Sequence, residues 1–408
     1  MYFKRYKELR MAYINFKEER YSTNKQIINR KKNNENIVKY ILKNKVDVMD
    51  YTPCKEYSFK NFEGVEFGKD GILDEAEFRV IESKDILCAK FIDCNFKNIK
   101  YKNCNFIGCV FENCNFYKGG VTFENCSFIK EGTEKLPSLN NKDNLGCSFY
   151  KCSIYAKFLN CDLSISLFEE CKIINTSFEL TYMKKCIIKN CELDKINFKD
   201  CNLSGFKTLS CYIIDLDFTD EDKTKFDEKT CFDKIVPREK TKEEYEGIYM
   251  TYETLSDKFK ENNLPDNSSE YYYLGKVSER KSLKKIVPKI GSYIYWISCG
   301  YGQRALFPVA TSISIIIIFT ILYLFIGIKV GDETIRFSIQ YLSSTNLKEI
   351  LSVINEAFNL SVGMFAGVGC INSEPIPGEY MLVNVEMLLG ILMMGVGVAT
   401  LIKKAKNN

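Results

Sequence analysis

Large hydrophobic residues recur at every fifth position through the first half of the chain. The step begins with Phe91, Phe96 and Tyr101, is lost over the polar stretch 131–146, and runs again from Leu163 to Phe218. A small residue, most often Cys, stands two positions before most of them. Neither a helix nor a strand places every fifth residue on one face, because their side-chain periods are 3.6 and 2. A chain that turns a corner every five residues does, so we predict stacked coils around a solid core.

Several runs within this pattern show a more specific similarity. These runs are Cys104-Asn105-Phe106, Cys114-Asn115-Phe116, Cys126-Ser127-Phe128 and Cys201-Asn202-Leu203. They resemble the pentapeptide-repeat family, whose pattern is a small residue, a polar residue, Leu or Phe, and two free positions. The resemblance implies a right-handed quadrilateral β-helix over residues 54–236, with four five-residue faces in each coil. We expect the polar segment 131–146 to be a surface loop.

The chain contains 18 Cys and no His. Cys171, Cys191 and Cys211 lie 20 residues apart, so the implied fold stacks them at about the inter-strand spacing of ~4.8 Å. A metal ladder, a disulfide and small buried hydrophobic side chains are the three alternatives, and we expect the last. Residues 1–50 are charged throughout and lack the apolar segment of a signal peptide, so we expect reduced cysteines in the cytosol.

The segments that flank the repeats have helical spacing. Residues 1–53 are basic and predict a solvated helical N-terminal cap, with a lipid-facing or nucleic-acid-binding arm as the alternative. Residues 237–285 predict a helical hairpin that caps the β-helix, broken around Pro265. Residues 286–304 contain aromatic residues and predict a helix at the membrane interface.

Two stretches near the C-terminal end are long and apolar enough to cross a membrane. Residues 305–328 carry no charge, and residues 380–402 carry only Glu386. Basic residues flank the two spans on one side, whereas the connection between them is acidic. The positive-inside rule therefore predicts a multi-pass protein of the cell membrane with both termini in the cytosol.

The connection between the spans has the pattern of a re-entrant segment. Residues 346–359 predict a short helix, and a glycine-rich turn and two prolines follow before the second span. This order resembles the pore unit of two-span potassium-type channels, which implies an all-α transmembrane pore domain over 305–408 with a re-entrant pore helix. The alternative is a helix and loop that only pack against a membrane anchor.

The resemblance assigns the filter-like loop to residues 365–370. It implies that the backbone of Phe365, Ala366, Gly367, Val368 and Gly369 binds ions, since glycines let successive carbonyl groups point one way. Cys370 and Glu374 then stand at the pore mouth. The family filter reads Thr-Val-Gly-Tyr-Gly-Asp, and only its two glycines match here, so the resemblance does not carry potassium selectivity over to this chain. The expected ion is a monovalent cation such as K⁺ or Na⁺.

Three residues of the second span are candidates for roles in the inner helix. A carboxyl group is costly in lipid, so Glu386 should meet a partner or water, or else extend to the interface. Gly390 allows bending or close helix contact. Gly395 is either a gating hinge or a point of tight packing.

These observations predict a homotetrameric cation channel with a cytosolic β-helix that acts as a sensor or an assembly scaffold. The partners expected are further copies of the chain, the lipid bilayer, and a cytosolic protein or small molecule on the β-helix. The alternative is a membrane-anchored scaffold that conducts no ions. Nucleic-acid mimicry needs a strongly acidic surface, and the mixture of Lys with Asp and Glu throughout the repeat region argues against it. No catalytic constellation or cofactor motif is evident, so we expect neither an enzyme nor a cofactor.

Overall fold

A computed structural model gives the fold of the 408-residue chain. It describes residues 13–44, 51–71, 73–117, 120–130, 144–331, 333–338, 346–370, 372–376, 378 and 380–407. The chain divides into two compact units, one over Ile14–Ser282 and one that contains Leu283–Asn408. Most of the predicted surface loop 131–146 and the predicted N-terminal residues 1–12 and 45–50 lie outside the described residues.

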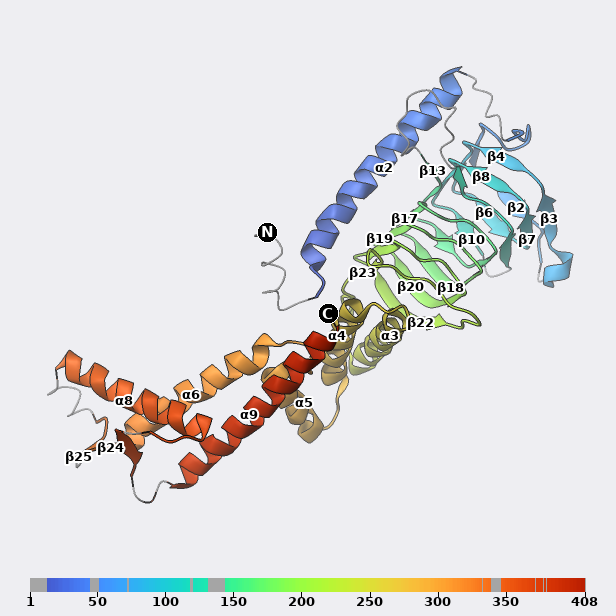
Figure 1. Ribbon diagram of the computed structural model, residues 1–408. Coiled ribbons are helices and arrows are strands. Elements are labelled where there is room, and N and C mark those ends of the chain that lie inside the picture. The colour runs from blue at the N-terminus through green and yellow to red at the C-terminus, as the bar shows by residue number, and fades with distance from the viewer. Residues whose placement is uncertain are drawn as a thin grey trace. The chain divides into compact units, whose positions relative to one another are not determined.

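The first unit is a four-sided parallel β-helix. One face is an eight-stranded sheet. Its strands in spatial order are β1 (Asn61–Glu63), β5 (Lys90–Ile92), β9 (Val110–Glu112), β14 (Ser148–Tyr150), β17 (Leu167–Glu169), β19 (Ile187–Lys189), β21 (Lys207–Leu209) and β23 (Cys231–Phe232). Figure 1 shows these strands stacked along the unit. The predicted β-helix is confirmed.

Two further faces share an eleven-stranded sheet. Its strands are β2 (Glu66–Gly68), β6 (Asn95–Lys97), β10 (Asn115–Phe116), β15 (Ser153–Ile154), β18 (Lys172–Glu179), β16 (Lys157–Leu159), β11 (Val121–Glu124), β7 (Ile99–Lys102), β3 (Arg79–Glu82), β20 (Glu192–Lys199) and β22 (Tyr212–Phe218). The fourth face contains β4 (Asp85–Leu87) beside β8 (Asn105–Ile107), followed by single bridges such as Asp162 to Tyr182. β12 (Ile129–Lys130) pairs with β13 (Leu145–Gly146), and a short 3₁₀ helix spans Glu75–Glu77.

The five-residue step produces this shape because each coil of four faces takes 20 residues. Phe158 therefore pairs with Phe178, and Phe178 with Phe198, in strict register. Their rings stack with centroids 5.1 and 5.2 Å apart inside the solenoid. Stacked aromatic rings of this kind stabilise the core through buried apolar area and ring–ring contact.

The corners between faces require a left-handed backbone. Residues at the corners have φ near +50°, and many of them are Asn or Asp directly before a Cys, as at Asn103, Asn113 and Asn190. Asn and Asp tolerate this conformation better than most residues. The Asn-Cys and Asp-Cys pairs are therefore a signal for the corners that the repeat spacing alone did not use.

The cysteines that follow the corners are free and buried. Their sulfur atoms donate to backbone carbonyl groups of the neighbouring coil, as Cys114 Sγ does to Phe91 O at 3.3 Å. Burial raises the pKa of Cys201 to about 12, which keeps that thiol protonated at neutral pH. The column thus consists of small side chains with a weak donor, the alternative that we expected.

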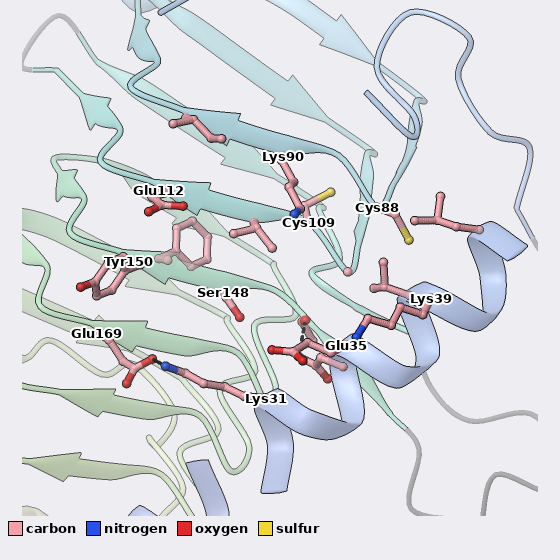
Figure 2. A pocket seen from close by; sticks show the side chains of 18 residues that line it. Lys31, Glu35, Lys39, Cys88, Lys90, Cys109, Glu112, Ser148, Tyr150 and Glu169 are labelled. Atoms are coloured by element: carbon pink, nitrogen blue, oxygen red, sulfur yellow. Dashed lines mark hydrogen bonds and ion pairs between the residues drawn. The ribbon is translucent and has the colours of Figure 1, made fainter. Parts of the chain in front are cut away.

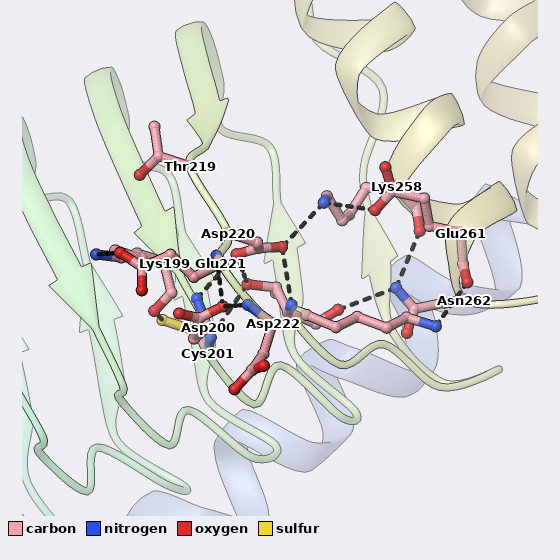
Figure 3. Close-up of polar contacts among 12 residues, drawn as sticks. Lys199, Asp200, Cys201, Thr219, Asp220, Glu221, Asp222, Lys258, Glu261 and Asn262 are labelled. Carbon is pink, nitrogen blue, oxygen red and sulfur yellow. Dashed lines mark hydrogen bonds and ion pairs between the residues drawn. The ribbon is translucent and has the colours of Figure 1, made fainter.

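A helical hairpin closes the C-terminal end of the β-helix. It consists of α3 (Lys242–Glu261) and α4 (Pro265–Ser282). The hydroxyl of Tyr271 in α4 donates to Phe232 O and accepts from Phe232 N, both at 2.7 Å, and so satisfies the last strand. Asp220 joins the final coil to α3, since it accepts from Lys258 Nζ at 2.9 Å and from the Asp200 amide at 2.8 Å (Figure 3).

The N-terminal helix differs from the prediction. α2 (Phe16–Asn44) does not cap an end of the solenoid; it lies along the eight-stranded sheet (Figure 1). Arg30 donates to Ile165 O at 2.8 Å, and Arg20 pairs with Asp233 at 2.8 Å. Buried isoleucines hold the helix down, including Ile27, Ile37 and Ile41. The sequence pattern missed this position because the face that α2 covers is set by contacts far away in the sequence.

The second unit is mainly helical. It contains α5 (Ile286–Cys299), α6 (Leu306–Ile326), α8 (Leu347–Ala366) and α9 (Tyr380–Asn407), with a small sheet of β24 (Ile328–Val330), β25 (Glu333–Ile335) and β26 (Ser373–Pro375). Among the described residues, two helices are long and apolar enough to cross a membrane, at Leu306–Ile326 and Tyr380–Lys403. A turn at Gly300–Gly302 with positive φ separates α5 from α6.

Candidate functional site

The helix between the two apolar helices is longer than predicted. We expected it over 346–359, whereas α8 continues to Ala366. Residues 360–366 contain no proline, and the backbone first turns left-handed at Gly367, where φ is +75°. Phe365 and Ala366, predicted to lie in a filter-like loop, are therefore the last residues of a helix. This corrects the predicted start of the loop.

A tight turn follows the helix. The amides of Val368 and Gly369 both donate to the carbonyl oxygen of Gly363, at 3.0 and 3.1 Å. Gly369 is again left-handed, with φ +76°. These bonds cap the C-terminal end of α8 in the manner of a glycine C-cap. Whether Gly367–Gly369 bind ions through their carbonyl groups stays a prediction.

The chain then returns along the helix that it has just left. The carbonyl oxygen of Gly369 lies so close to Gly363 that a Cβ there would be 2.1 Å from it. Four residues later, Ser373 Oγ donates to the carbonyl of Glu356 at 3.3 Å, further back along α8. β26 then pairs with β24, the strand that directly follows α6. The chain therefore turns back at the end of α8 and runs beside this helix toward β24.

Gly390 is the contact point between this segment and α9. A Cβ at Gly390 would stand 1.9 Å from the carbonyl oxygen of Phe365. Gly390 follows Tyr380 by ten residues, or about 15 Å of helix, which is half of a ~30 Å hydrocarbon core. The end of α8 thus reaches the middle of α9. A Cβ at Gly395 would have no neighbouring atom of the described residues within 4 Å, so Gly395 is not a point of tight packing among them.

Glu386 joins three helices through its carboxyl group. The side chain is fully buried. Tyr323 of α6 donates its hydroxyl to Oε2 at 2.6 Å, and Ser361 of α8 donates to Oε1 at 2.5 Å. Ser361 Oγ also lies 3.0 Å from the carbonyl of Ile316. Glu386 therefore meets polar partners inside the unit and does not extend to an interface.

The two residues predicted for the pore mouth lie on the returning chain. Cys370 is partly exposed, and its sulfur lies 3.3 Å from Ser373 Oγ. Glu374 is exposed in β26, opposite Lys329 of β24. Cys370 and Glu374 thus stand on the segment that leaves the turn, whereas Gly390 and Glu386 hold its helix in place.

Comparison with known proteins bears on the first unit. Residues 89–128 match the family model for pentapeptide repeats, in eight copies. The chain contains a pentapeptide-repeat domain. Solved structures of QnrB1, a plasmid-mediated fluoroquinolone resistance protein, are 14% and 15% identical over 39% and 41% of this chain, and 73% and 92% of their own, with TM-scores of 0.19 and 0.17.

HetL, a pentapeptide-repeat protein involved in heterocyst differentiation regulation in the cyanobacterium Nostoc, is 8% identical over 40% of this chain and 83% of its own, with a TM-score of 0.13. The 20-residue strand register continues beyond the matched residues 89–128, as in the pairing of Phe178 with Phe198. No curated protein matches the chain.

Three residues of the site were not among the predicted ones. Tyr323 and Ser361 donate hydrogen bonds to Glu386, and Gly363 has no side chain, so that the backbone of Gly369 can pack against it. The signal for the first two was available, because a carboxyl group in an apolar span requires polar partners on neighbouring helices. The sequence pattern did not show which helices are neighbours, because that depends on how the spans pack.

Proposed function

We propose that the C-terminal unit spans the cell membrane twice and assembles with further copies of itself into a cation-conducting pore. The pentapeptide-repeat domain lies in the cytosol as an assembly scaffold or sensor. The observation that supports this proposal is the turn at Gly367–Gly369, where the chain leaves α8 next to its contact with Gly390 of the apolar helix α9. Irregular backbone within a membrane persists only where it lines a cavity or is covered by protein.

The described residues leave much of the turn uncovered. Gly367 is exposed, and Val368 is 82% exposed. Lipid offers no hydrogen-bond donors to the carbonyl groups there, so lipid contact at this point is unfavourable. In a ring of copies, each turn can lie on a common water-filled axis, where water and ions replace lipid around its carbonyl groups. Four copies are expected from the resemblance to two-span channels.

The charge of the site supports a cation as the conducted ion. The C-terminal end of a helix carries a partial negative charge, and α8 directs its C-terminal end to mid-depth. The turn residues Gly367, Val368 and Gly369 carry no cationic side chain that would oppose this field. The Thr, Tyr and Asp of the potassium filter are absent, so the proposal does not extend to potassium selectivity.

The flanking charges support the orientation with cytosolic termini. Lys284, Lys285 and Lys289 precede α6, and Lys403 stands near the end of α9. The described part of the connection contains Glu333, Glu349, Glu356 and Glu374. Basic residues near the ends of spans remain in the cytosol.

A cation-flux experiment tests the proposal, with the thiol of Cys370 as a site for chemical block. Full-length protein in liposomes should release a monovalent cation gradient and should be oligomeric by native mass spectrometry. A membrane-impermeant cationic thiol reagent should reduce the flux by reaction with the part-exposed Cys370. Cys370→Ser should abolish this sensitivity, whereas Cys54→Ser, which removes the other part-exposed thiol, should not.

A monomeric protein, or flux no greater than in protein-free liposomes, contradicts the channel. A membrane-anchored scaffold is then the better function. The length of α8 favours that second candidate, because a helix that continues through Ala366 leaves only Gly367–Gly369 as a short non-helical turn. Cross-linking separates the two, since a scaffold does not require a closed ring of copies.

A further inference from the structure

A groove runs between α2 and the outer face of the eight-stranded sheet (Figure 2). Its volume is about 480 Å³, within the range of about 300–1,000 Å³ that is usual for small-molecule sites. The Lys31–Glu169 ion pair ties α2 to β17 beside it. Buried contacts of Ile37 and Ile41 with Leu87 and Ile107 fix the helix at the other end. The groove is thus held open by packing on either side.

Apolar side chains line the groove from both walls. Ile92 of β5 and Val110 of β9 point outward from the sheet and are only partly covered. Val38 and Leu42 come from α2, and Leu42 is 51% exposed. Water-exposed apolar walls that face each other across a cavity favour an apolar group between them.

Opposite charges face this apolar lining. Lys39 and Glu35 belong to α2, and Lys90 and Glu112 belong to β5 and β9 (Figure 2). Among the residues that the structure describes, none of these four side chains has an ion-pair partner within 4.0 Å. Two cations and two anions around one cavity complement a ligand that itself carries both signs of charge.

We propose that this groove binds a small zwitterion with an apolar side chain, of the class of the large free amino acids. Lys39 and Lys90 pair with its carboxylate, and Glu35 and Glu112 pair with its ammonium group. The side chain rests on Ile92 and Val110. Such a ligand bridges α2 and the sheet, so it stabilises the folded pentapeptide-repeat domain by mass action. The proposal is independent of ion conduction.

Direct binding to the full-length protein tests the charge requirement. Ligand-observed NMR titrations use three probes with the same ring: L-tryptophan, tryptamine without the carboxylate, and indole-3-propionate without the ammonium group. L-tryptophan should bind about tenfold or more tightly than either analogue, since each charged hydrogen bond is lost in one of them. It should also raise the unfolding temperature of the pentapeptide-repeat domain.

A matched pair of variants tests whether the ligand binds in the groove between α2 and the eight-stranded sheet. Val110→Trp fills the groove and should abolish binding of L-tryptophan. Val80→Trp adds the same ring at a 54% exposed position of β3, on another face, and should leave binding unchanged. Thermal unfolding confirms that both variants fold. The proposal is overturned when no probe binds, when the three probes bind equally, or when Val80→Trp weakens binding as much as Val110→Trp. It is also overturned when Val110→Trp separates copies of the chain, because a second copy would then be the occupant.

Discussion

The two units of the protein place their apolar and polar groups in opposite ways. In the β-helix the aromatic rings are inside: Phe149 stacks between Phe111 and Phe168 at 4.7 and 4.5 Å and is buried. In the C-terminal unit many apolar residues face outward around a small apolar core, as Ile318 and Leu392 do, and the polar cluster around Glu386 is buried. The first arrangement suits water as the solvent, whereas the second suits lipid.

The difference extends to how each unit is stabilised. The β-helix repeats one contact from coil to coil, so each residue supports a local layer. The C-terminal unit depends on contacts that occur once, such as Gly390 against Phe365 and Glu386 against Tyr323. A substitution should therefore have a local effect in the first unit and a global effect in the second.

The largest effect should come from Phe149→Ala in the β-helix. Loss of a fully buried ring costs about 3–5 kcal/mol of unfolding free energy. Hydrogen exchange of the full chain should place the loss in the coils next to β14, with the C-terminal unit unchanged. The control Tyr21→Ala, at a 74% exposed position of α2, should change stability by less than about 0.5 kcal/mol. A loss of protection that spreads evenly through all coils would contradict local support.

Gly390→Ala should have the next largest effect, on the whole C-terminal unit. The added carbon would lie 1.9 Å from a backbone oxygen, and overpacking of this kind costs about 1–3 kcal/mol. We expect α8 to separate from α9, with aggregation in detergent and loss of any cation flux. Gly395→Ala is the matched control, because no atom lies within 4 Å of its added carbon. Equal behaviour of the two variants would show that the contact is not needed.

Glu386→Leu should destabilise the C-terminal unit, because it removes the acceptor of the hydrogen bonds from Tyr323 and Ser361. It leaves the Tyr323 hydroxyl without its acceptor, at a cost of about 1–3 kcal/mol. Glu386→Gln keeps an acceptor for Tyr323 and should recover most of the loss. Thermal unfolding in detergent measures both variants. If Glu386→Leu proves as stable as Glu386→Gln, the hydrogen bonds of Glu386 with Tyr323 and Ser361 do not stabilise the unit, and apolar packing alone holds the three helices together.

The smallest effect concerns pH and the end of the β-helix. Glu244 accepts the amides of Arg238, Glu239 and Lys240 at 2.6, 3.0 and 2.6 Å. Burial raises the pKa of Glu244, but these bonds outweigh that effect and hold the pKa below its ordinary value. Its stabilisation is therefore present above the unfolded pKa and lost as the pH falls through the folded one.

Glu244→Gln should then cost about 1 kcal/mol at pH 7, and the difference from the unmodified chain should shrink as the pH falls below the ordinary glutamate pKa of about 4.3. Thermal unfolding over this range measures the difference. Glu246→Gln, at an exposed position of the same helix, is the control and should show no gap at either pH. If the stability difference between Glu244→Gln and the unmodified chain persists in acid, the substitution acts through packing and not through the charge of Glu244.

The repeated part of the protein was predictable from its sequence, whereas the unique contacts were not. The five-residue step predicted stacked coils with the aromatic and cysteine columns inside, and the resemblance to pentapeptide repeats implied the β-helix. The position of α2 along the sheet, the length of α8 and the partners of Glu386 were missed or misjudged. Tyr323 and Glu386 are 63 residues apart, and no local pattern relates them.

The sequence by itself determined the elements that repeat a local rule: a corner every five residues, and two helices long and apolar enough to cross a membrane. Local sterics and hydrophobic burial act over a few residues, so the pattern contains them in full. The tertiary structure alone decided that α2 lies along the sheet, that Gly390 admits the end of α8, and that Tyr323 and Ser361 meet Glu386. These contacts depend on shape complementarity between distant segments, which exists only once the chain has folded.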